Sequence, residues 1–216
     1  MQRITQAPAQ FYRRQEKDKI GREIRAIGNP KKATNFELFS DLFILPGETL
    51  NRWITSSSNV LIIPLFGAVE LYAPGINEFA HINQVASFYI KAGSKLRFKN
   101  VYPEHTVRFL IIAIKSTNET AKRTVDYTLN TLNTLKEVYK YSDSQLYLNL
   151  GNFEVRKERI YQFNDSSNSV FAYVLQGAFE FENRLLETGE ALCCWDTDQV
   201  ALEALTGDAY LLLLEF

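Results

Sequence analysis

The sequence predicts an all-β protein made of two similar domains, and three observations support this prediction. The first is a β-rich apolar run that breaks at Gly67 and continues as an alternating run, over residues 59–72. The second is a later copy of this pattern over residues 169–182, with its break at Gly177. The third is a turn signal about every ten residues, a spacing typical of a sandwich or barrel. Short β-rich runs that break at a single glycine indicate paired strands rather than a helix.

The first half of the chain is expected to be a series of strands separated by turns. Residues 1–35 are polar and are interrupted by Gly21, Gly28 and Pro30, so we expect an arm or a short strand with loops there. The Pro46-Gly47 dipeptide marks a turn after the first long strand. The expected strands are residues 36–45, the two sides of the Gly67 turn, 83–90, 95–100 and 106–115.

The second half repeats the pattern after a polar stretch. Residues 116–141 lack proline and glycine, and within them residues 131–138 suit a strand or a weak helix, of which a strand between the domains is favoured. The expected strands that follow are residues 154–161, the two sides of the Gly177 turn, 200–205 and 209–216, and residues 185–195 are expected to form a turn that enters a strand. We expect the strand at 209–216 at the centre of a sheet, because an exposed edge this apolar would promote aggregation.

The charges are unevenly distributed, although the formal net charge is only −1. Residues 1–142 carry 20 Lys and Arg against 12 Asp and Glu, a net of +8, and residues 143–216 carry 4 against 13, a net of −9. The basic excess is densest between Arg13 and Lys32, where acidic residues are interleaved. A nucleic-acid footprint is one explanation, but the near-neutral chain favours an internal one, in which the basic half lies against the acidic half.

The composition excludes several classes of protein. No apolar run reaches the roughly 18–20 residues that a membrane span requires, and the N-terminus has no apolar segment of signal-peptide length. The two cysteines, Cys193 and Cys194, are adjacent. Adjacent cysteines meet disulfide geometry poorly, so two reduced thiols in a strand are expected. We therefore expect a cytoplasmic protein without a membrane partner or a redox role.

The doubled hairpins resemble the cupin superfamily, and specifically the two-domain pirin-like proteins. The matching segments are residues 60–72, 100–115, 186–196, 202–205 and 208–216. The resemblance covers residues 36–115 and 143–216 and implies two tandem cupin-type β-sandwich or barrel domains. It implies an N-terminal cupin with its arm over residues 1–117, a connection over 118–142 and a C-terminal cupin over 143–216.

Pirins and the related quercetin dioxygenases bind a divalent, iron-type metal in the N-terminal cupin. The first cupin motif, G-x5-H-x-H-x4-E-x6-G, fits between Gly47 and Gly67, but its ligand places fall on Trp53, Thr55 and Val60. None of these three is an ordinary ligand for a first-row metal. The remaining ligand place, downstream of Gly93, falls near Glu104, His105 and Thr106.

The histidine count supports the same conclusion, because His81 and His105 are the only histidines of the chain. Three histidines of one chain therefore cannot surround a metal. In the second half, the motif counted back from Gly177 places Phe163, Asp165 and Val170 at the ligand positions. We expect a bicupin without a metal or another cofactor.

Some of these residues allow a second interpretation. Glu104 and His105 could form an acid–base pair, but adjacent residues of a strand point to opposite faces, and an ordinary loop position is favoured. His81 is expected in a surface loop. Trp53 could offer a stacking face to a ligand, although filling of the barrel interior is favoured.

The sequence contains no dinucleotide, phosphate-loop, nucleophile-elbow or zinc-protease motif and predicts no catalytic residue. We predict a non-catalytic protein that binds a small molecule or another protein, but no nucleic acid. The candidate pocket consists of the family's ligand places, Trp53, Thr55, Val60, Glu104 and His105. The alternative is a metal-dependent oxidoreductase similar to quercetin 2,3-dioxygenase, which the missing histidines disfavour. The ligand, the protein partner and the oligomeric state stay undetermined.

Overall fold

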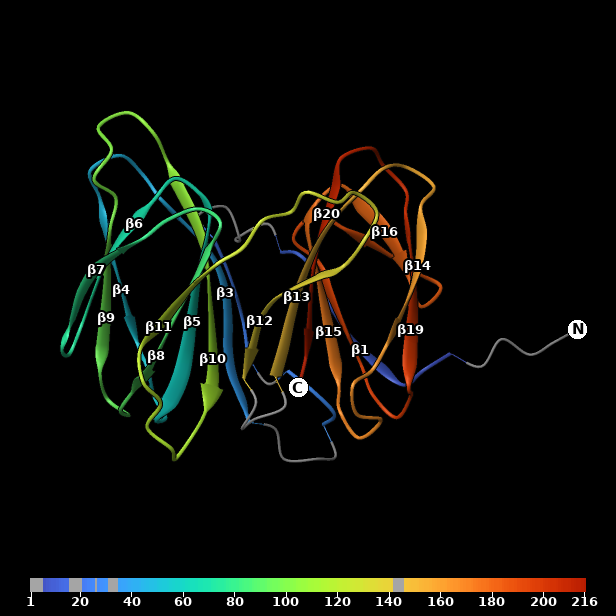
Figure 1. Cartoon of the computed structure of the whole chain (residues 1–216), viewed down its shortest axis with the longest axis horizontal. Helices are drawn as coiled ribbons and strands as arrows, with labels where there is room; N and C mark the ends of the chain where they lie inside the picture. Colours follow the sequence, from blue (N-terminus) through green and yellow to red (C-terminus); the bar gives the residue numbers. More distant parts are fainter. Residues whose placement is uncertain (1–5, 16–20, 26, 31–34, 142–145) are drawn as a thin grey trace, which may run out of the picture. The chain divides into compact units, whose positions relative to one another are not determined.

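The computed structural model describes residues 6–15, 21–25, 27–30, 35–141 and 146–216. These residues form twenty β-strands and no helix, so the all-β prediction is confirmed (Figure 1). Two parts of the predicted basic segment, residues 16–20 and the Lys31-Lys32 pair, lie outside the described residues. In the described ranges, no helix has the length and apolar character needed to cross a membrane.

The chain divides into two compact units. The N-terminal unit comprises Gln15–Ile27 and Thr34–Thr128, and the C-terminal unit comprises Met1–Arg14, Gly28–Ala33 and Leu129–Phe216. The strands of the N-terminal unit are β2 (Gly21–Ile24), β3 (Phe36–Ile44), β4 (Thr49–Trp53), β5 (Ser58–Phe66), β6 (Val69–Ala73), β7 (Ile76–Ala80), β8 (Gln84–Ile90), β9 (Lys95–Lys99), β10 (Val107–Lys115) and β11 (Arg123–Asp126). The strands of the C-terminal unit are β1 (Ala9–Tyr12), β12 (Lys136–Tyr141), β13 (Leu146–Phe153), β14 (Glu158–Gln162), β15 (Val170–Gln176), β16 (Ala178–Phe181), β17 (Arg184–Glu187), β18 (Ala191–Cys194), β19 (Gln199–Ala204) and β20 (Ala209–Glu215).

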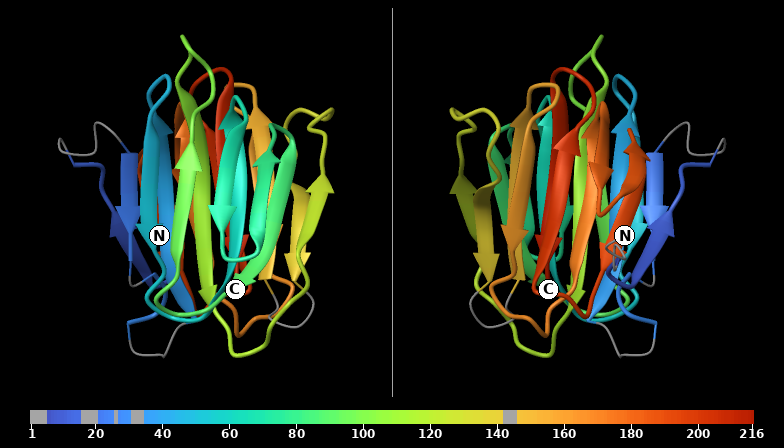
Figure 2. Two further views of the ribbon diagram at one scale, coloured as in Figure 1. Left: turned by 90° about the vertical axis from the view of Figure 1, so that its left-hand side faces the viewer. Right: turned by 90° about the vertical axis from the view of Figure 1, so that its right-hand side faces the viewer.

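Each unit consists of one six-stranded and one four-stranded antiparallel sheet, and the two units repeat the same strand order. In the N-terminal unit the orders are β11-β8-β5-β10-β3-β2 and β4-β9-β6-β7. In the C-terminal unit they are β1-β18-β15-β20-β13-β12 and β14-β19-β16-β17. Figure 2 presents the antiparallel strands of the N-terminal unit on the left and those of the C-terminal unit on the right. The final strand, β20, lies at the centre of its sheet, as predicted.

The compact units group the N-terminal residues differently from the expected domain boundaries. Strand β1 pairs with β18 of the C-terminal unit, with Ala9 opposite Cys194, and thus takes the place that β11 takes beside β8 in the N-terminal unit. The expected connection over 118–142 also contains two strands, of which β11 belongs to the N-terminal unit and β12 to the C-terminal unit. The strand expected at 131–138 begins later, at Lys136, because residues 131–134 form a turn in which Asn133 has a positive φ of 61°.

The two glycine hairpins form where the sequence predicts them. Gly67 separates β5 from β6 with φ +73°, and Gly177 separates β15 from β16 with φ +79°. These angles lie in the left-handed region, which a residue with a Cβ rarely enters. A Cβ at Gly177 would also lie 2.3 Å from the hydroxyl of Thr206, so glycine is required there for space as well as for conformation.

Each unit has its own hydrophobic core between its two sheets. In the N-terminal unit Phe98 and Phe109 belong to this core, with ring centroids 4.8 Å apart. In the C-terminal unit Phe153 and Phe179 meet edge to face at 5.7 Å. Strands alternate their side chains between two faces, which explains why the strands of the four-stranded sheets read as alternating sequences.

Candidate functional site

The candidate pocket residues do not gather around one cavity. Trp53, the last residue of β4, is 60% exposed, so its expected role in filling the barrel interior is wrong. Thr55 lies in the loop between β4 and β5, and Val60 of β5 is fully buried in the hydrophobic core. Strand alternation causes this difference: Trp53 pairs with Lys95, and both side chains belong to the outer face of the four-stranded sheet.

Glu104 and His105 lie together in the loop before β10, and both are exposed. No hydrogen bond or ion pair joins their side chains in the described part of the chain. The loop is fixed instead by Asn100, whose buried amide group donates to the carbonyl oxygens of Ile44 (3.0 Å) and His105 (2.7 Å). Its side-chain oxygen accepts from the Tyr102 N–H at 2.9 Å. His105 therefore contributes its main chain to the fold, and its imidazole reaches solvent.

His81 is exposed in the turn between β7 and β8, which agrees with the predicted surface position. Its ring stacks on that of Phe79, with centroids 6.0 Å apart. The main-chain N–H of His81 donates to the side chain of Gln84 at 3.1 Å.

A buried glutamate, Glu37 of β3, organises the loop that contains Thr55. One of its carboxylate oxygens accepts from the Thr55 N–H (3.0 Å), the Thr55 hydroxyl (2.7 Å) and the Ser56 N–H (3.1 Å). The other oxygen accepts from the Ser58 hydroxyl at 3.1 Å. Burial by itself raises the pKa of Glu37, but the hydrogen bonds from Thr55 and Ser56 outweigh it and hold the pKa below its usual value. The carboxylate is therefore ionised at neutral pH and fully occupied by the loop.

The C-terminal unit holds its corresponding loop with Glu215 of β20, which is fully buried. Its carboxylate accepts from the main-chain and side-chain nitrogens of Asn164, each at 2.7 Å, and from the side chain of Asn168 at 2.9 Å. It also accepts from the Tyr161 hydroxyl at 2.7 Å. Burial and then this hydrogen bond raise the pKa of Tyr161, so the phenol stays protonated and acts as a donor.

The sequence interpretation missed both glutamates, although a signal for them was present. Glu37 follows Phe36 at the start of an apolar strand, and Glu215 follows four leucines at the end of another. A carboxylate inside such a strand is rarely buried without several hydrogen-bond donors. That expectation points to a local network, but it does not identify the loop that supplies the donors.

The residues that motif spacing assigns to the ligand places of the C-terminal unit make structural contacts. Val170 is fully buried in the core, and Phe163 is a partly buried residue that packs against this core. Asp165 accepts from the main chain and the hydroxyl of Ser167 at 2.8 and 2.7 Å, which stabilises the turn before β15.

The residues that motif spacing assigns to the ligand places therefore do not fit a cupin metal. Indole, hydroxyl and isopropyl groups stand at the positions that motif spacing assigns to the histidines and the glutamate, and Val60 belongs to the hydrophobic core of the N-terminal unit. In the described residues, no group of three or more His, Cys, Asp or Glu side chains is arranged to hold a metal ion. First-row metals in proteins require imidazole, thiolate or carboxylate donors, and the buried carboxylate nearest to Thr55, Glu37, is already satisfied by the loop.

Cys193 and Cys194 are free and buried in β18, as predicted. Burial raises the pKa of the Cys194 thiol to about 12 and raises that of Cys193 as well. A thiol with a raised pKa is a poor nucleophile at neutral pH, so neither cysteine is a candidate catalytic group.

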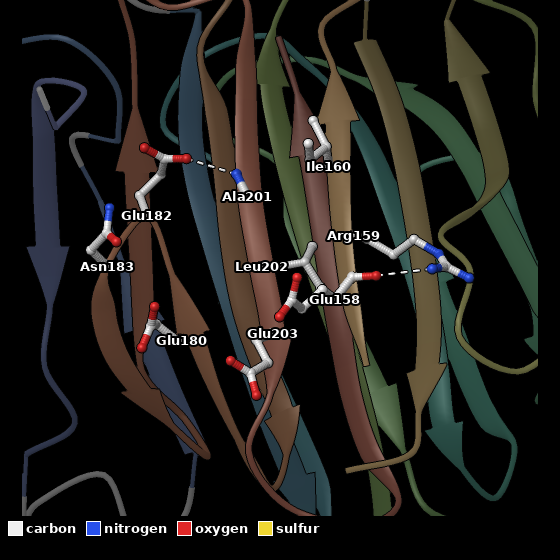
Figure 3. Close-up of a pocket in the computed structure, with 9 residues that line it drawn as sticks. All are labelled: Glu158, Arg159, Ile160, Glu180, Glu182, Asn183, Ala201, Leu202 and Glu203. Carbon is white, nitrogen blue, oxygen red and sulfur yellow. Dashed lines mark hydrogen bonds between the residues drawn. The ribbon is translucent and has the colours of Figure 1, made fainter. Parts of the chain in front are cut away.

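The outer face of the four-stranded sheet in the C-terminal unit carries a shallow concavity of about 570 Å³. Four glutamates, Glu158, Glu180, Glu182 and Glu203, line it together with hydrophobic and polar neighbours (Figure 3). Glu182 accepts from the Ala201 N–H at 2.7 Å, which fixes one rim.

A family model described as the quercetinase C-terminal cupin domain matches residues 142–216. No curated protein matches the sequence. The matched segment contains β13 to β20, which make up most of the C-terminal unit.

Solved structures with the same fold cover nearly the whole chain. YhaK from Escherichia coli has a TM-score of 0.76 at 12% identity, with 90% of this chain and 92% of that chain covered. The bacterial pirin YhhW from Escherichia coli, in complex with nickel(II), has a TM-score of 0.69 at 14% identity, with 91% of this chain and 90% of that chain covered. This chain has the pirin-type bicupin fold. Quercetin 2,3-dioxygenase from Acinetobacter baumannii shares that fold, with a TM-score of 0.66 at 13% identity and coverage of 84% and 74%. The predicted resemblance to pirin-like bicupins is thereby confirmed. At sequence identities this low, the similarity to the solved structures shows only that the fold is shared.

Proposed function

We propose that this pirin-type bicupin is a non-catalytic binding protein that uses its surface to bind other proteins, in the cytoplasm. The observation that carries the proposal is the position of Val60 and its neighbours. Val60, at one of the positions that motif spacing assigns to the family's metal ligands, is fully buried in the hydrophobic core of the N-terminal unit. A valine side chain has no donor atom that could replace the ligand of a metal there.

The charged outer faces of the four-stranded sheets favour protein binding over small-molecule binding. The concavity on the C-terminal unit is open, and four of its nine lining residues are glutamates. Small-molecule sites usually enclose most of their ligand and are lined mainly by hydrophobic side chains. The free, buried cysteines are consistent with a reducing compartment.

A metal-dependent activity similar to quercetin 2,3-dioxygenase is the second candidate. The match to the quercetinase C-terminal cupin model favours it. This match, however, lies in the half of the chain opposite to the one in which pirin-like proteins bind their metal. It therefore supports common ancestry of the C-terminal cupin without supporting a metal site in the N-terminal one.

Incubation of the purified protein with quercetin and oxygen, after addition of Fe(II), Ni(II), Mn(II) or Cu(II), tests the proposal. Quercetin absorbance and dissolved oxygen are followed together, with a metal-only solution as the control. The proposal predicts consumption equal to that of the control. Consumption that depends on the protein and is stoichiometric in quercetin and oxygen would replace the proposal by the dioxygenase alternative.

A further inference from the structure

The equivalent outer sheet faces of the two units carry opposite charge. In the N-terminal unit, β9 presents Lys95, Arg97 and Lys99 on one face, because alternate residues of a strand point the same way. All three residues are exposed. Glu70 of β6 lies beside Lys99, so the formal charges of these four residues sum to +2. We call this surface the basic face.

The matching surface of the C-terminal unit is acidic. Glu158 of β14 lies directly opposite Glu203 of β19, and Glu203 lies directly opposite Glu180 of β16. Side chains at such positions are roughly 5 Å apart at Cβ, and like charges there destabilise the sheet. Arg156 forms an ion pair with Glu203 at 3.2 Å, while Glu182 adds a fourth carboxylate at the rim (Figure 3). We call this surface the acidic face.

Both faces also expose large hydrophobic side chains. On the basic face Trp53 is 60% exposed beside Lys95, and Phe79 is 44% exposed beside Glu70. On the acidic face Ile160 is 62% exposed, and Leu185 is 55% exposed opposite Glu180. Exposed hydrophobic side chains surrounded by charges are characteristic of protein interfaces, whose hydrophobic centre is enclosed by a polar rim.

We propose that the chain associates with a second copy of itself, with the basic face of one molecule on the acidic face of the next. The inference rests on the proposed function, because it names the partner of a surface-binding protein. The two faces differ from each other, so the contact is heterologous and leaves one free face at each end of a dimer. Assembly can therefore continue beyond the dimer. The close row of glutamates is stabilised when lysine and arginine side chains of the neighbouring molecule approach it.

The cations of the basic face suit this role in their geometry. The cations along β9 are alternate residues of one strand and are therefore roughly 6.7 Å apart, while the glutamates of the acidic face lie on neighbouring strands roughly 4.8 Å apart. Arg97 is held over the ring of Tyr72, with its guanidinium carbon 4.0 Å from the ring centroid. Tyr72 in turn donates a hydrogen bond to Glu70. The central cation of the face is thus positioned before a partner binds, which lowers the entropy cost of association.

Two neutralised variants separate the faces. The first, K95Q/R97Q/K99Q, removes the cations of the basic face, and the second, E158Q/E180Q/E203Q, removes the carboxylates of the acidic face. A matched control, K91Q/K115Q/K140Q, has the same charge change as the first variant at exposed lysines that lie outside the two four-stranded sheets. Weight-average mass is measured by sedimentation equilibrium across roughly a hundredfold range of concentration, at about 50 mM and about 500 mM salt.

The wild-type protein and the lysine control are expected to exceed the monomer mass as concentration rises at low salt. Their association constant should fall at least about tenfold at high salt, because screening weakens contacts between exposed charges. Each face variant alone should stay monomeric. A mixture of the two variants restores one native contact and should give a one-to-one dimer that grows no further.

Three results would overturn the inference: a wild-type protein that stays monomeric at low salt, a face variant that associates like wild type, or a mixture that stays monomeric. Exposed aromatic and basic side chains on a sheet also suit single-stranded nucleic acid, so the same proteins are titrated with a labelled oligonucleotide. Oligonucleotide binding by a monomeric wild-type protein, lost in K95Q/R97Q/K99Q, would replace the self-association. Quercetin turnover tests the proposed function separately. A failure of the self-association proposal is therefore distinguishable from a failure of the proposed function.

Discussion

Replacement of Glu37 tests whether one buried carboxylate fixes the loop at the family's ligand place. Glu37 accepts four hydrogen bonds, from two main-chain N–H groups and two hydroxyls. A buried donor left without an acceptor costs about 1–3 kcal/mol, and water can reach part of this loop, so E37A should lower the free energy of unfolding of the N-terminal unit by about 3–4 kcal/mol. E37Q keeps an accepting oxygen of the same size and loses the charge, which should cost about 1 kcal/mol.

The assay is urea unfolding followed by tryptophan fluorescence. The chain has two tryptophans, Trp53 in the N-terminal unit and Trp195 in the C-terminal unit. A W195F background therefore reports the N-terminal unit alone, which matters because two units need not unfold in one transition. The reasoning is refuted if E37A lies within about 0.5 kcal/mol of its background, the range of ordinary surface substitutions.

The same variants carry a pH prediction. The pKa of Glu37 is lowered in the folded protein, so its stabilisation is complete above the pKa of an unfolded glutamate and is lost as pH falls through the folded value. The difference in unfolding free energy between the W195F protein and its E37Q variant should therefore be constant near neutral pH and shrink in acid. A difference that grows as pH falls would mean that the carboxylate is destabilised by burial instead.

Three further predictions concern other parts of the fold. E215A should destabilise the C-terminal unit by about 3–5 kcal/mol in urea unfolding, because five hydrogen bonds converge on its carboxylate; a cost below about 1 kcal/mol would contradict this account. Deletion of residues 1–13 removes β1 from its place beside β18, so the buried Cys194 should react with a thiol reagent at least about tenfold faster, and an unchanged rate would count against the pairing. N100A should cost about 2–4 kcal/mol by chemical unfolding, while H105A should stay within about 0.5 kcal/mol of wild type; equal effects would show that the His105 side chain is structural.

The sequence was sufficient for the parts of the fold that depend on local pattern. The Gly67 and Gly177 hairpins were predictable, because a break at one glycine between β-rich runs identifies a positive-φ turn. The central position of β20 was predictable as well, because its hydrophobic run cannot lie exposed at an edge. The pairing of β1 with β18 was not predictable, since it joins residues about 180 positions apart and Ala9–Tyr12 has no distinctive pattern.

The candidate site was predicted less well than the fold. Motif spacing located Val60 at a family ligand place and indicated that it could not bind a metal, but spacing alone does not give the direction of a side chain. For Trp53 the favoured role was wrong, because alternation along β4 places the indole on the outer face. Glu37 and Glu215 were missed because their donors come from loops far along the chain, and a buried carboxylate is recognised only when those loops are in place.

The metal content of the purified protein tests the central claim most directly. The protein is produced in medium supplemented with iron, manganese, nickel and copper, and its metals are quantified by plasma emission spectroscopy. Because motif spacing assigns the family's ligand places to Trp53, Thr55 and Val60, the account predicts less than about a tenth of an equivalent of any metal. A single metal at about one equivalent would contradict it, and would mean that carboxylates or His105 form a site that the cupin motif does not describe.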